Sequence, residues 1–205
     1  MSGVSIVFVC DVLMIVVKCM NFCSQCGSRV ETKVPEGDNR PRHICIDCGV
    51  IHYQNPNVVT GCIPEWEGKV LLCRRAIEPR RGYWTLPAGF LENGESTQEG
   101  ALRETVEEAN ARVLVGPLYT LFSLPHIDQI YMLFRGPLQD LDYGPGVESL
   151  EVKLFSEEEI PWDDLAFQVV AETLKYYFED QRRGEFRLRS GVIERLPGTE
   201  RRYRT

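Results

Sequence analysis

The segment from Gly89 to Ala111, GFLENGESTQEGALRETVEEANA, constrains the fold of this chain more than any other stretch. Glu92-Asn93-Gly94 is rich in turn-forming residues, so the first part is expected to be a loop. Ser96 followed three residues later by Glu99 makes a capping box, which predicts that a helix begins here. The segment therefore predicts a glycine-containing loop that leads directly into a helix.

The predicted helix combines an apolar stripe with a cluster of carboxylates. Leu102, Val106 and Ala109 recur at spacings of four and three, and we expect this stripe to face the core. Three carboxylates fall on the opposite side of the helix: Glu104, Glu107 and Glu108. Such like-charge pairs each cost roughly 0.2–0.5 kcal/mol in an isolated helix, and a bound cation would remove that cost. Oxygen ligands without cysteine or histidine favour Mg²⁺ or Mn²⁺.

A solvated, glutamate-rich helix face is the alternative interpretation of these carboxylates. The preceding glycine loop and Glu95 favour a metal site instead. The whole pattern resembles the nudix hydrolase box, G-x5-E-x7-R-E-U-x-E-E-x-G-U, in which U is an aliphatic residue. Its fixed positions are occupied here by Gly89, Glu95, Arg103, Glu104, Glu107 and Glu108.

The chain departs from the box at Thr105, Asn110 and Ala111, which replace two aliphatic residues and the final glycine. Thr105 still offers a methyl group to the core. We expect Asn110 to end the helix in a left-handed conformation, because asparagine tolerates that conformation best after glycine.

The resemblance implies an α/β fold, a three-layer α/β/α nudix sandwich with a mixed sheet. It also implies hydrolysis of a nucleoside diphosphate linked to another group, with the metal held by the Gly89 carbonyl, Glu104, Glu107 and Glu108. Arg103 is expected to pair with Glu95 and so orient the helix. Apolar runs predict strands over residues 58–63, 69–75 and 131–134, and the apolar spacing within 166–178 predicts a closing helix.

Two cysteine pairs upstream have the spacing of a four-cysteine zinc site: Cys23-x-x-Cys26 and Cys45-x-x-Cys48. Each pair precedes a glycine that suits a tight turn. Four thiolates leave no open coordination position, so zinc here would be structural. Two disulfides are the alternative, which nothing else in the chain supports, since no other feature indicates an oxidising compartment. Cys62 and Cys73 lie in apolar strands and are interpreted as buried thiols.

The combination of zinc ribbon and nudix box resembles the zinc-ribbon nudix enzymes of bacteria and plastids that act on ADP-ribose or FAD. The runs that carry this resemblance are Tyr53-Gln54-Asn55-Pro56 and residues 84–90, WTLPAGF. NADH pyrophosphatases carry an S-Q-P-W-P-F-P run after the box, whereas residues 124–130 here read LPHIDQI. That difference argues against NADH as the preferred substrate.

Substrate contacts are expected around the loop before the box. Arg75 ends a predicted strand and is expected to contact phosphate, with a solvated arginine as the alternative. Trp84, Tyr83 or Phe90 is expected to stack on adenine or flavin, although at least one of them is expected in the core.

The identity of the general base stays open between Glu104, the first glutamate of the REUxEE run, and a distant loop glutamate. Glu148 follows Pro145-Gly146 and is the first choice for that loop residue, with Glu151 as the second. Both could equally be ordinary loop charges. Hydrolysis would yield FMN and AMP from FAD, or AMP and ribose 5-phosphate from ADP-ribose.

The expected organisation is an apolar extension (1–20), a zinc ribbon (21–54), a nudix domain (55–180) and an arginine-rich tail (181–205). The apolar run of the extension is too short to cross a bilayer comfortably and lacks the basic start of a signal peptide. We therefore expect translation to begin at Met20, with a membrane anchor as the alternative. The tail is expected to form a surface hairpin around residues 186–189, or a solvated extension.

With 205 residues, 43% of them hydrophobic, the chain can bury one mid-sized core and a small appendage. The net charge of −7 offers no general attraction for nucleic acid. We expect a cytoplasmic enzyme with a small nucleotide substrate and no stable membrane association, and a homodimer is left open. A house-cleaning nucleoside triphosphate pyrophosphatase and a non-catalytic nucleotide sensor are the alternatives.

Overall fold

The computed structural model describes residues 20–195 and 201–204. The apolar extension predicted at residues 1–19 lies outside the described residues. The chain divides between Asn55 and Pro56 into two compact units. Within the described ranges, no helix is long and apolar enough to cross a membrane.

The smaller unit is a three-stranded antiparallel sheet in the order β1-β2-β3: β1 (Val30–Lys33), β2 (Arg42–Cys45) and β3 (Ile51–His52). Tight turns follow the two cysteine pairs. Gly27 and Gly49 have φ angles of 78° and 70°, and their amides donate to the carbonyls of Cys23 and Cys45. Glycine reaches positive φ most easily. Gly27 and Gly49 therefore permit the tight turns that bring the two cysteine pairs toward each other.

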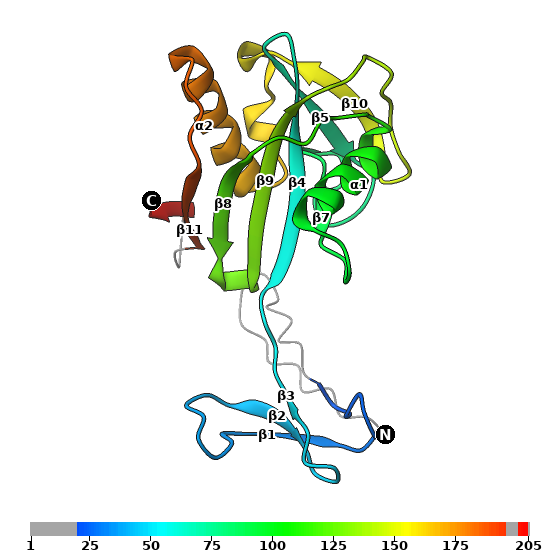
Figure 1. Ribbon diagram of the computed structural model, residues 1–205, viewed down its shortest axis with the longest axis vertical. Helices are drawn as coiled ribbons and strands as arrows, with labels where there is room; N and C mark the ends of the chain where they lie inside the picture. Colours follow the sequence, from blue (N-terminus) through cyan, green and yellow to red (C-terminus); the bar gives the residue numbers. More distant parts are fainter. Residues whose placement is uncertain (1–19, 196–200, 205) are drawn as a thin grey trace. The chain divides into compact units, whose positions relative to one another are not determined.

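The larger unit is built on one mixed sheet (Figure 1). Its main path runs β10-β5-β4-β9-β8-β11-β12, with β6 beside β5 and β7 beside β4. The strands are β4 (Asn57–Trp66), β5 (Lys69–Arg75), β6 (Trp84–Thr85), β7 (Ala88–Phe90), β8 (Leu118–Leu124), β9 (Gln129–Pro137), β10 (Ser149–Phe155), β11 (Arg189–Arg195) and β12 (Arg201–Arg204). The pairs β4–β9 and β8–β11 are parallel, and the others are antiparallel.

Two helices, α1 (Thr97–Ala109) and α2 (Gln168–Arg183), cover the two faces of this sheet. The alternation along β5 shows this directly. Val70 and Leu72 lie in the core cluster that contains the apolar side of α2, whereas Leu71 and Cys73 pack in the cluster that contains Ala109 of α1. The predicted α/β/α sandwich is therefore confirmed. Three short 3-10 helices complete the unit: η1 (Pro125–Ile127), η2 (Glu157–Glu159) and η3 (Trp162–Asp164).

The predicted strands and the closing helix are present, but the predicted orientation of α1 is wrong. Leu102 and Val106 are 40% and 44% exposed, whereas Glu104 and Glu108 are only 9% and 6% exposed. The helix instead presents small buried residues to the sheet, and Gly100 leaves no room for a methyl group beside the Thr60 side chain. This close approach turns the carboxylate side inward, where it meets β7.

The position of β7 explains why the Glu104 and Glu108 carboxylates contact a strand. β4 pairs with β5 only near its end, at Glu65 and Trp66, and pairs with β7 at residues 59–61. β6 and β7 therefore occupy the space where β4 and β5 separate. Gly61 permits this arrangement, since a Cβ atom there would lie 2.3 Å from that of Ala88. This arrangement places Gly89 against the inner side of α1.

The C-terminal segment completes the sheet. The hairpin predicted around residues 186–189 is formed later, by β11 and β12, and β11 lies parallel to β8. Phe186 packs against the main core, and Ile193 is buried within it. Asp180, near the end of α2, anchors this segment because its buried carboxylate pairs with Arg189 and accepts a hydrogen bond of 3.0 Å from the Tyr119 hydroxyl.

We predict that Asp180→Ala destabilises the protein by about 1–3 kcal/mol, because it leaves the buried Tyr119 hydroxyl and the partly exposed Arg189 guanidinium without their partner. The matched control is Glu179→Ala, which removes the more exposed partner of Arg183 and should cost less than about 1 kcal/mol. Urea unfolding of both variants measures the difference. Equal losses for the two would contradict an anchoring role for Asp180.

Candidate active site and metal centres

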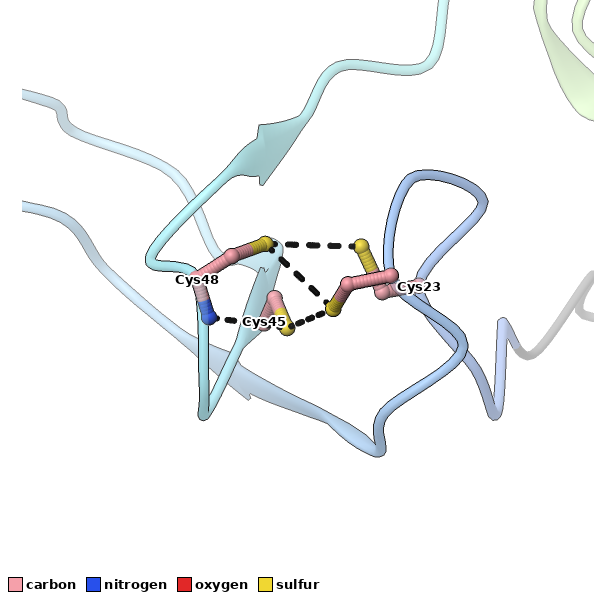
Figure 2. A group of neighbouring side chains, drawn as sticks. Cys23, Cys45 and Cys48 are labelled. Carbon is pink, nitrogen blue, oxygen red and sulfur yellow. Dashed lines mark hydrogen bonds between the residues drawn. The ribbon is translucent and has the colours of Figure 1, made fainter.

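The four predicted zinc ligands converge in the smaller unit, as Figure 2 shows for Cys23, Cys45 and Cys48. The Sγ atoms of Cys23 and Cys48 are 3.7 Å apart, and that of Cys26 lies 3.4 Å from Cys45 and 3.5 Å from Cys48. A tetrahedral zinc with bonds of about 2.3 Å requires sulfur atoms roughly 3.8 Å apart, whereas a disulfide requires about 2.05 Å. The sulfur positions fit one zinc ion, and these three pairs lie well beyond disulfide bonding distance, which favours zinc over the disulfide alternative.

The surroundings of the cysteines suit thiolates. The amides of Gln25 and Cys48 donate to the sulfurs of Cys23 and Cys45, each at 3.4 Å. The Nε2 atom of His52 lies 3.3 Å from the Cys23 sulfur. Hydrogen bonds of this kind hold metal ligands in orientation. The donor set and its surroundings therefore fit a closed structural site.

We predict that the purified protein holds one zinc per chain and that Cys45→Ser loses it, because a three-thiolate site binds zinc less tightly. Cys62→Ser is the matched control, since Cys62 is a buried thiol in the other unit. Elemental analysis and the circular dichroism of chelator-treated protein measure the effect. Zinc retained at full stoichiometry by Cys45→Ser would contradict the assignment.

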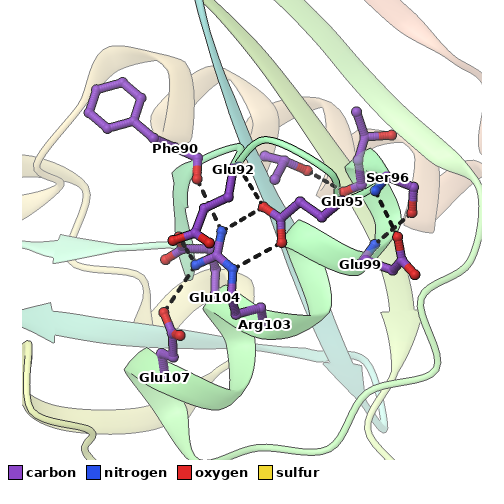
Figure 3. A network of polar contacts seen from close by, with 10 residues as sticks. Phe90, Glu92, Glu95, Ser96, Glu99, Arg103, Glu104 and Glu107 are labelled. Atoms are coloured by element: carbon purple, nitrogen blue, oxygen red, sulfur yellow. Dashed lines mark hydrogen bonds and ion pairs between the residues drawn. The ribbon is translucent and has the colours of Figure 1, made fainter.

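In the larger unit, Arg103 organises the loop before α1 (Figure 3). Its guanidinium makes the expected pair with Glu95, through hydrogen bonds of 3.0 and 2.8 Å, and also donates to the Phe90 carbonyl at 3.0 Å. Further bonds reach Glu104 at 2.7 Å and Glu107 at 3.1 Å. The Arg103 guanidinium lowers the pKa of Glu95 to about 2. The pair is therefore charged and fastens the loop to the helix.

The inner face of α1 brings two carboxylates against β7. The amide of Ala88 donates to Glu108 at 3.2 Å. A Cβ atom on Gly89 would lie 2.2 Å from the nearer carboxylate oxygen of Glu104, so only glycine allows this approach. Glu107 differs, because its side chain is 57% exposed and turns toward Arg103. The structure thus groups Glu104 and Glu108 beside Gly89 and leaves Glu107 at the outer rim.

The electrostatics of this pair suit a cation. The pKa of Glu108 is raised to about 8, chiefly by burial; the hydrogen bond from the Ala88 amide and the charge of Arg75 oppose the rise, whereas the negative charges of Glu104 and Glu148 contribute to it. Burial also raises the pKa of Glu104. Carboxylates that are buried with too little positive charge nearby are costly, and a divalent ion removes that cost. The donor set of oxygens alone fits a hard cation such as Mg²⁺ or Mn²⁺.

Arg75 is 9% exposed and so is not the solvated arginine of the alternative interpretation. Its Nε donates to the Pro79 carbonyl at 2.9 Å, and its guanidinium lies 5.2 Å from the centre of the Phe167 ring. The charge of Arg75 reaches Glu108 on one side and Tyr131 on another. Arg75 therefore stands between the carboxylates and the aromatic residues around Phe167.

A hollow of about 300 Å³ adjoins Phe167, and its lining includes Arg80, Tyr83, Trp162, Leu165 and Gln168. Of the aromatic residues proposed from the sequence, Tyr83 lines this hollow. Trp84 packs edge-on against Phe155 with ring centres 4.9 Å apart, and Phe90 is 55% exposed. Phe167 lies in the segment that the sequence predicts as the closing helix, and Trp162 was not among the residues proposed for the site. The Pro161-Trp162 pair just before α2 is the sequence feature from which Trp162 could have been proposed as a site residue.

Comparison with known proteins places this geometry in a family. A model described as NUDIX domain matches residues 55–181, and a zinc-ribbon model described as Nudix N-terminal matches residues 21–54. The chain belongs to the nudix family. A solved structure of a nudix hydrolase from Nitrosomonas europaea is 60% identical, with a TM-score of 0.81, and the match covers 84% of this chain and 99% of that one.

Two curated nudix relatives illustrate the range of named activities. An ADP-ribose pyrophosphatase of Methanocaldococcus jannaschii is 37% identical over 37% of this chain and 45% of its own length. A NAD-capped RNA hydrolase, NudC, of Vibrio atlanticus is 32% identical over 46% of this chain and 33% of its own length. The chain spans less than two thirds of the length of the curated relatives that it matches first.

We predict that the metal-free protein loses stability as pH rises, because the pKa of Glu108 is raised from 4.5 to about 8 on folding. The folded state then holds a proton that the unfolded state releases, so this contribution is complete below the unfolded pKa and is lost between about pH 5 and about pH 8. Thermal unfolding of the wild type in chelator should show a steeper decline over this range than Glu108→Gln.

Excess Mg²⁺ should flatten the decline in the wild type, since the cation takes the place of the proton, and should change Glu108→Gln less. Parallel curves for the two proteins in chelator would contradict the raised pKa.

Proposed function

We propose that this nudix protein is a metal-dependent pyrophosphatase that hydrolyses the diphosphate of a nucleoside diphosphate derivative, with FAD, ADP-ribose or both as its substrates. The observation that carries the proposal is the pair of buried carboxylates, Glu104 and Glu108, held beside Gly89 and the Ala88 amide. Arg103 pairs with Glu104, and a structural role alone would not favour a second buried acid, Glu108, beside that pair.

The proposed metal ligands are Glu104, Glu108, Glu107 and the Gly89 carbonyl, with Glu107 turning inward from Arg103. A bound Mg²⁺ or Mn²⁺ ion would neutralise charge on the diphosphate and lower the pKa of an attacking water. Arg75 lies beside Glu108. It is the proposed contact to the phosphate that stays bonded to the nucleoside after the diphosphate is hydrolysed. Its burial and its hydrogen bond to Pro79 hold the guanidinium in place for that role.

Glu148 is the proposed general base. Its charge acts on both Glu104 and Glu108, so it lies on the same side of the site. Glu151, the second loop candidate, is instead 3.7 Å from Arg74, and both of these side chains are about half exposed. Glu104 is tied to Arg103 and packed on Gly89, which favours a ligand role for it over proton transfer.

The hollow beside Phe167 is the proposed site for the planar group of the substrate. Tyr83, Trp162 and Phe167 contribute to its lining, whose accessible surface is mainly polar, and Arg75 contacts Phe167 and acts on Glu108. Nucleotide pockets combine aromatic side chains with a few polar groups. We therefore place adenine or flavin on one side of Arg75 and the diphosphate on the other. Tyr83, the residue before Trp84 in the chain, is therefore the proposed stacking residue instead of Trp84.

The test is to incubate purified protein and Mg²⁺ separately with FAD, ADP-ribose, NADH and an oxidised deoxynucleoside triphosphate, and to resolve the products by chromatography. We expect AMP together with FMN or ribose 5-phosphate. Glu108→Gln should lower kcat by about 10³-fold or more, because it removes a buried metal ligand. Glu179→Gln, on the exposed side of α2, should keep full activity.

The alternatives give different results in the same experiment. Pyrophosphate and a nucleoside monophosphate from the oxidised triphosphate would indicate a house-cleaning enzyme. Tight nucleotide binding without turnover of any substrate would refute the pyrophosphatase and indicate a sensor. Preferred cleavage of NADH would bring the protein closer to the relative named as a NAD-capped RNA hydrolase.

A further inference from the structure

Asn110 occupies the position where the nudix box has its final glycine, and its backbone behaves as glycine would. Its φ and ψ are 47° and 27°, in the left-handed region, and its amide donates to the Val106 carbonyl at 2.9 Å. Asparagine is thus tolerated at this helix end, as the sequence predicted. The backbone conformation alone does not explain the contacts that the Asn110 side chain makes.

The Asn110 side chain holds a loop that a glycine could not hold. Its amide nitrogen donates to the carbonyl of Gly144 at 3.3 Å and to that of Pro145 at 3.0 Å. These two bonds use both hydrogens of the amide group. Residues 143–148, here called the Glu148 loop, are therefore attached to the end of the helix that carries Glu104 and Glu108.

The backbone of the Glu148 loop completes the attachment. The last carbonyls of a helix have no partner within the helix. Here Gly144 donates to the Ala109 carbonyl at 2.8 Å, and Gly146 donates to the Glu108 carbonyl at 3.0 Å. A Cβ atom on Gly146 would lie 1.7 Å from the Glu107 carbonyl oxygen. The loop therefore lies directly against the last turn of α1.

Glu148 lies just beyond this contact and has a second anchor. Its carbonyl accepts a hydrogen bond of 2.8 Å from the amide of Ala76, the residue after Arg75. The loop is thus held at α1 on one side and at the end of β5 on the other. Its single glutamate, Glu148, lies at the second anchor, where its charge acts on Glu104 and Glu108.

We propose that Asn110 is a positioning residue that sets the place of the Glu148 carboxylate relative to the metal-binding face of α1. The proposal rests on the proposed function for the role of Glu148, whereas the docking of the loop is independent of it. Asn110→Gly is the decisive substitution, because glycine adopts the same left-handed backbone but offers no amide donor. The fold and the melting temperature should therefore change little.

The first measurement is amide hydrogen exchange of the full-length protein. We expect Asn110→Gly to increase exchange at Gly144 and Gly146 by about tenfold, because opening of the loop no longer requires the two side-chain bonds to break. Asp128→Gly is the matched control. Asp128 also has a positive φ, of 51°, but lies on the connection between β8 and β9. Unchanged exchange at both glycines in Asn110→Gly would overturn the docking role.

The second measurement is steady-state kinetics on the better of FAD and ADP-ribose. We expect Asn110→Gly to lower kcat by about tenfold with little change in KM, because a displaced base slows proton transfer without weakening substrate binding. The same substitution should have no further effect in a Glu148→Gln background. An equal loss in that background, or increased exchange with unchanged kcat, would overturn the positioning role.

The two measurements separate this proposal from the proposed function. If the wild type hydrolyses none of the substrates, the proposed function fails, and hydrogen exchange still decides whether Asn110 holds the loop. If the wild type is active and Glu148→Gln retains full kcat, Glu148 is not the base and the positioning role fails with it.

Discussion

The larger unit depends on one costly arrangement, the burial of the Glu104 and Glu108 carboxylates between α1 and β7. The residues around them reduce that cost or keep the two carboxylates buried. Gly89 leaves room for Glu104, the Ala88 amide donates to Glu108, and Arg103 supplies a positive charge. Because the remaining positive charge does not balance both carboxylates, we expect the pair to bind a cation, as the proposed hydrolysis of a diphosphate requires.

The second constraint is the separation of β4 from β5, which makes room for β6 and β7. Without it, Gly89 would not lie beside α1, and the box would be an ordinary amphipathic helix. On its other edge β5 pairs with β10, which places Arg75 opposite Ser149 and so next to Glu148. The proposed metal ligands, phosphate contact and general base thus come from β5, β7, α1 and the Glu148 loop and meet where the sheet opens.

Local signals in the sequence were sufficient for much of this. The capping box at Ser96 and Glu99, the Arg103–Glu95 pair and the left-handed Asn110 depend on residues close in sequence, so spacing predicts them well. The four cysteines are likewise recognisable from spacing, because a tetrahedral site demands two tight turns. The buried thiols of Cys62 and Cys73 follow from the apolar strands around them.

Contacts between distant segments could not be predicted in this way. Leu102 and Val106 suggested the wrong buried face of α1, because periodicity ranks hydrophobicity and ignores the close approach of the helix to the sheet at Gly100. The parallel pairing of β11 with β8 was missed, since it joins segments far apart in the sequence. The sequence by itself determined the family, the candidate metal ligands and the helix ends, because these follow from local chemistry. Only the tertiary structure decided which carboxylates are buried and which loop reaches them, because burial depends on how distant elements pack.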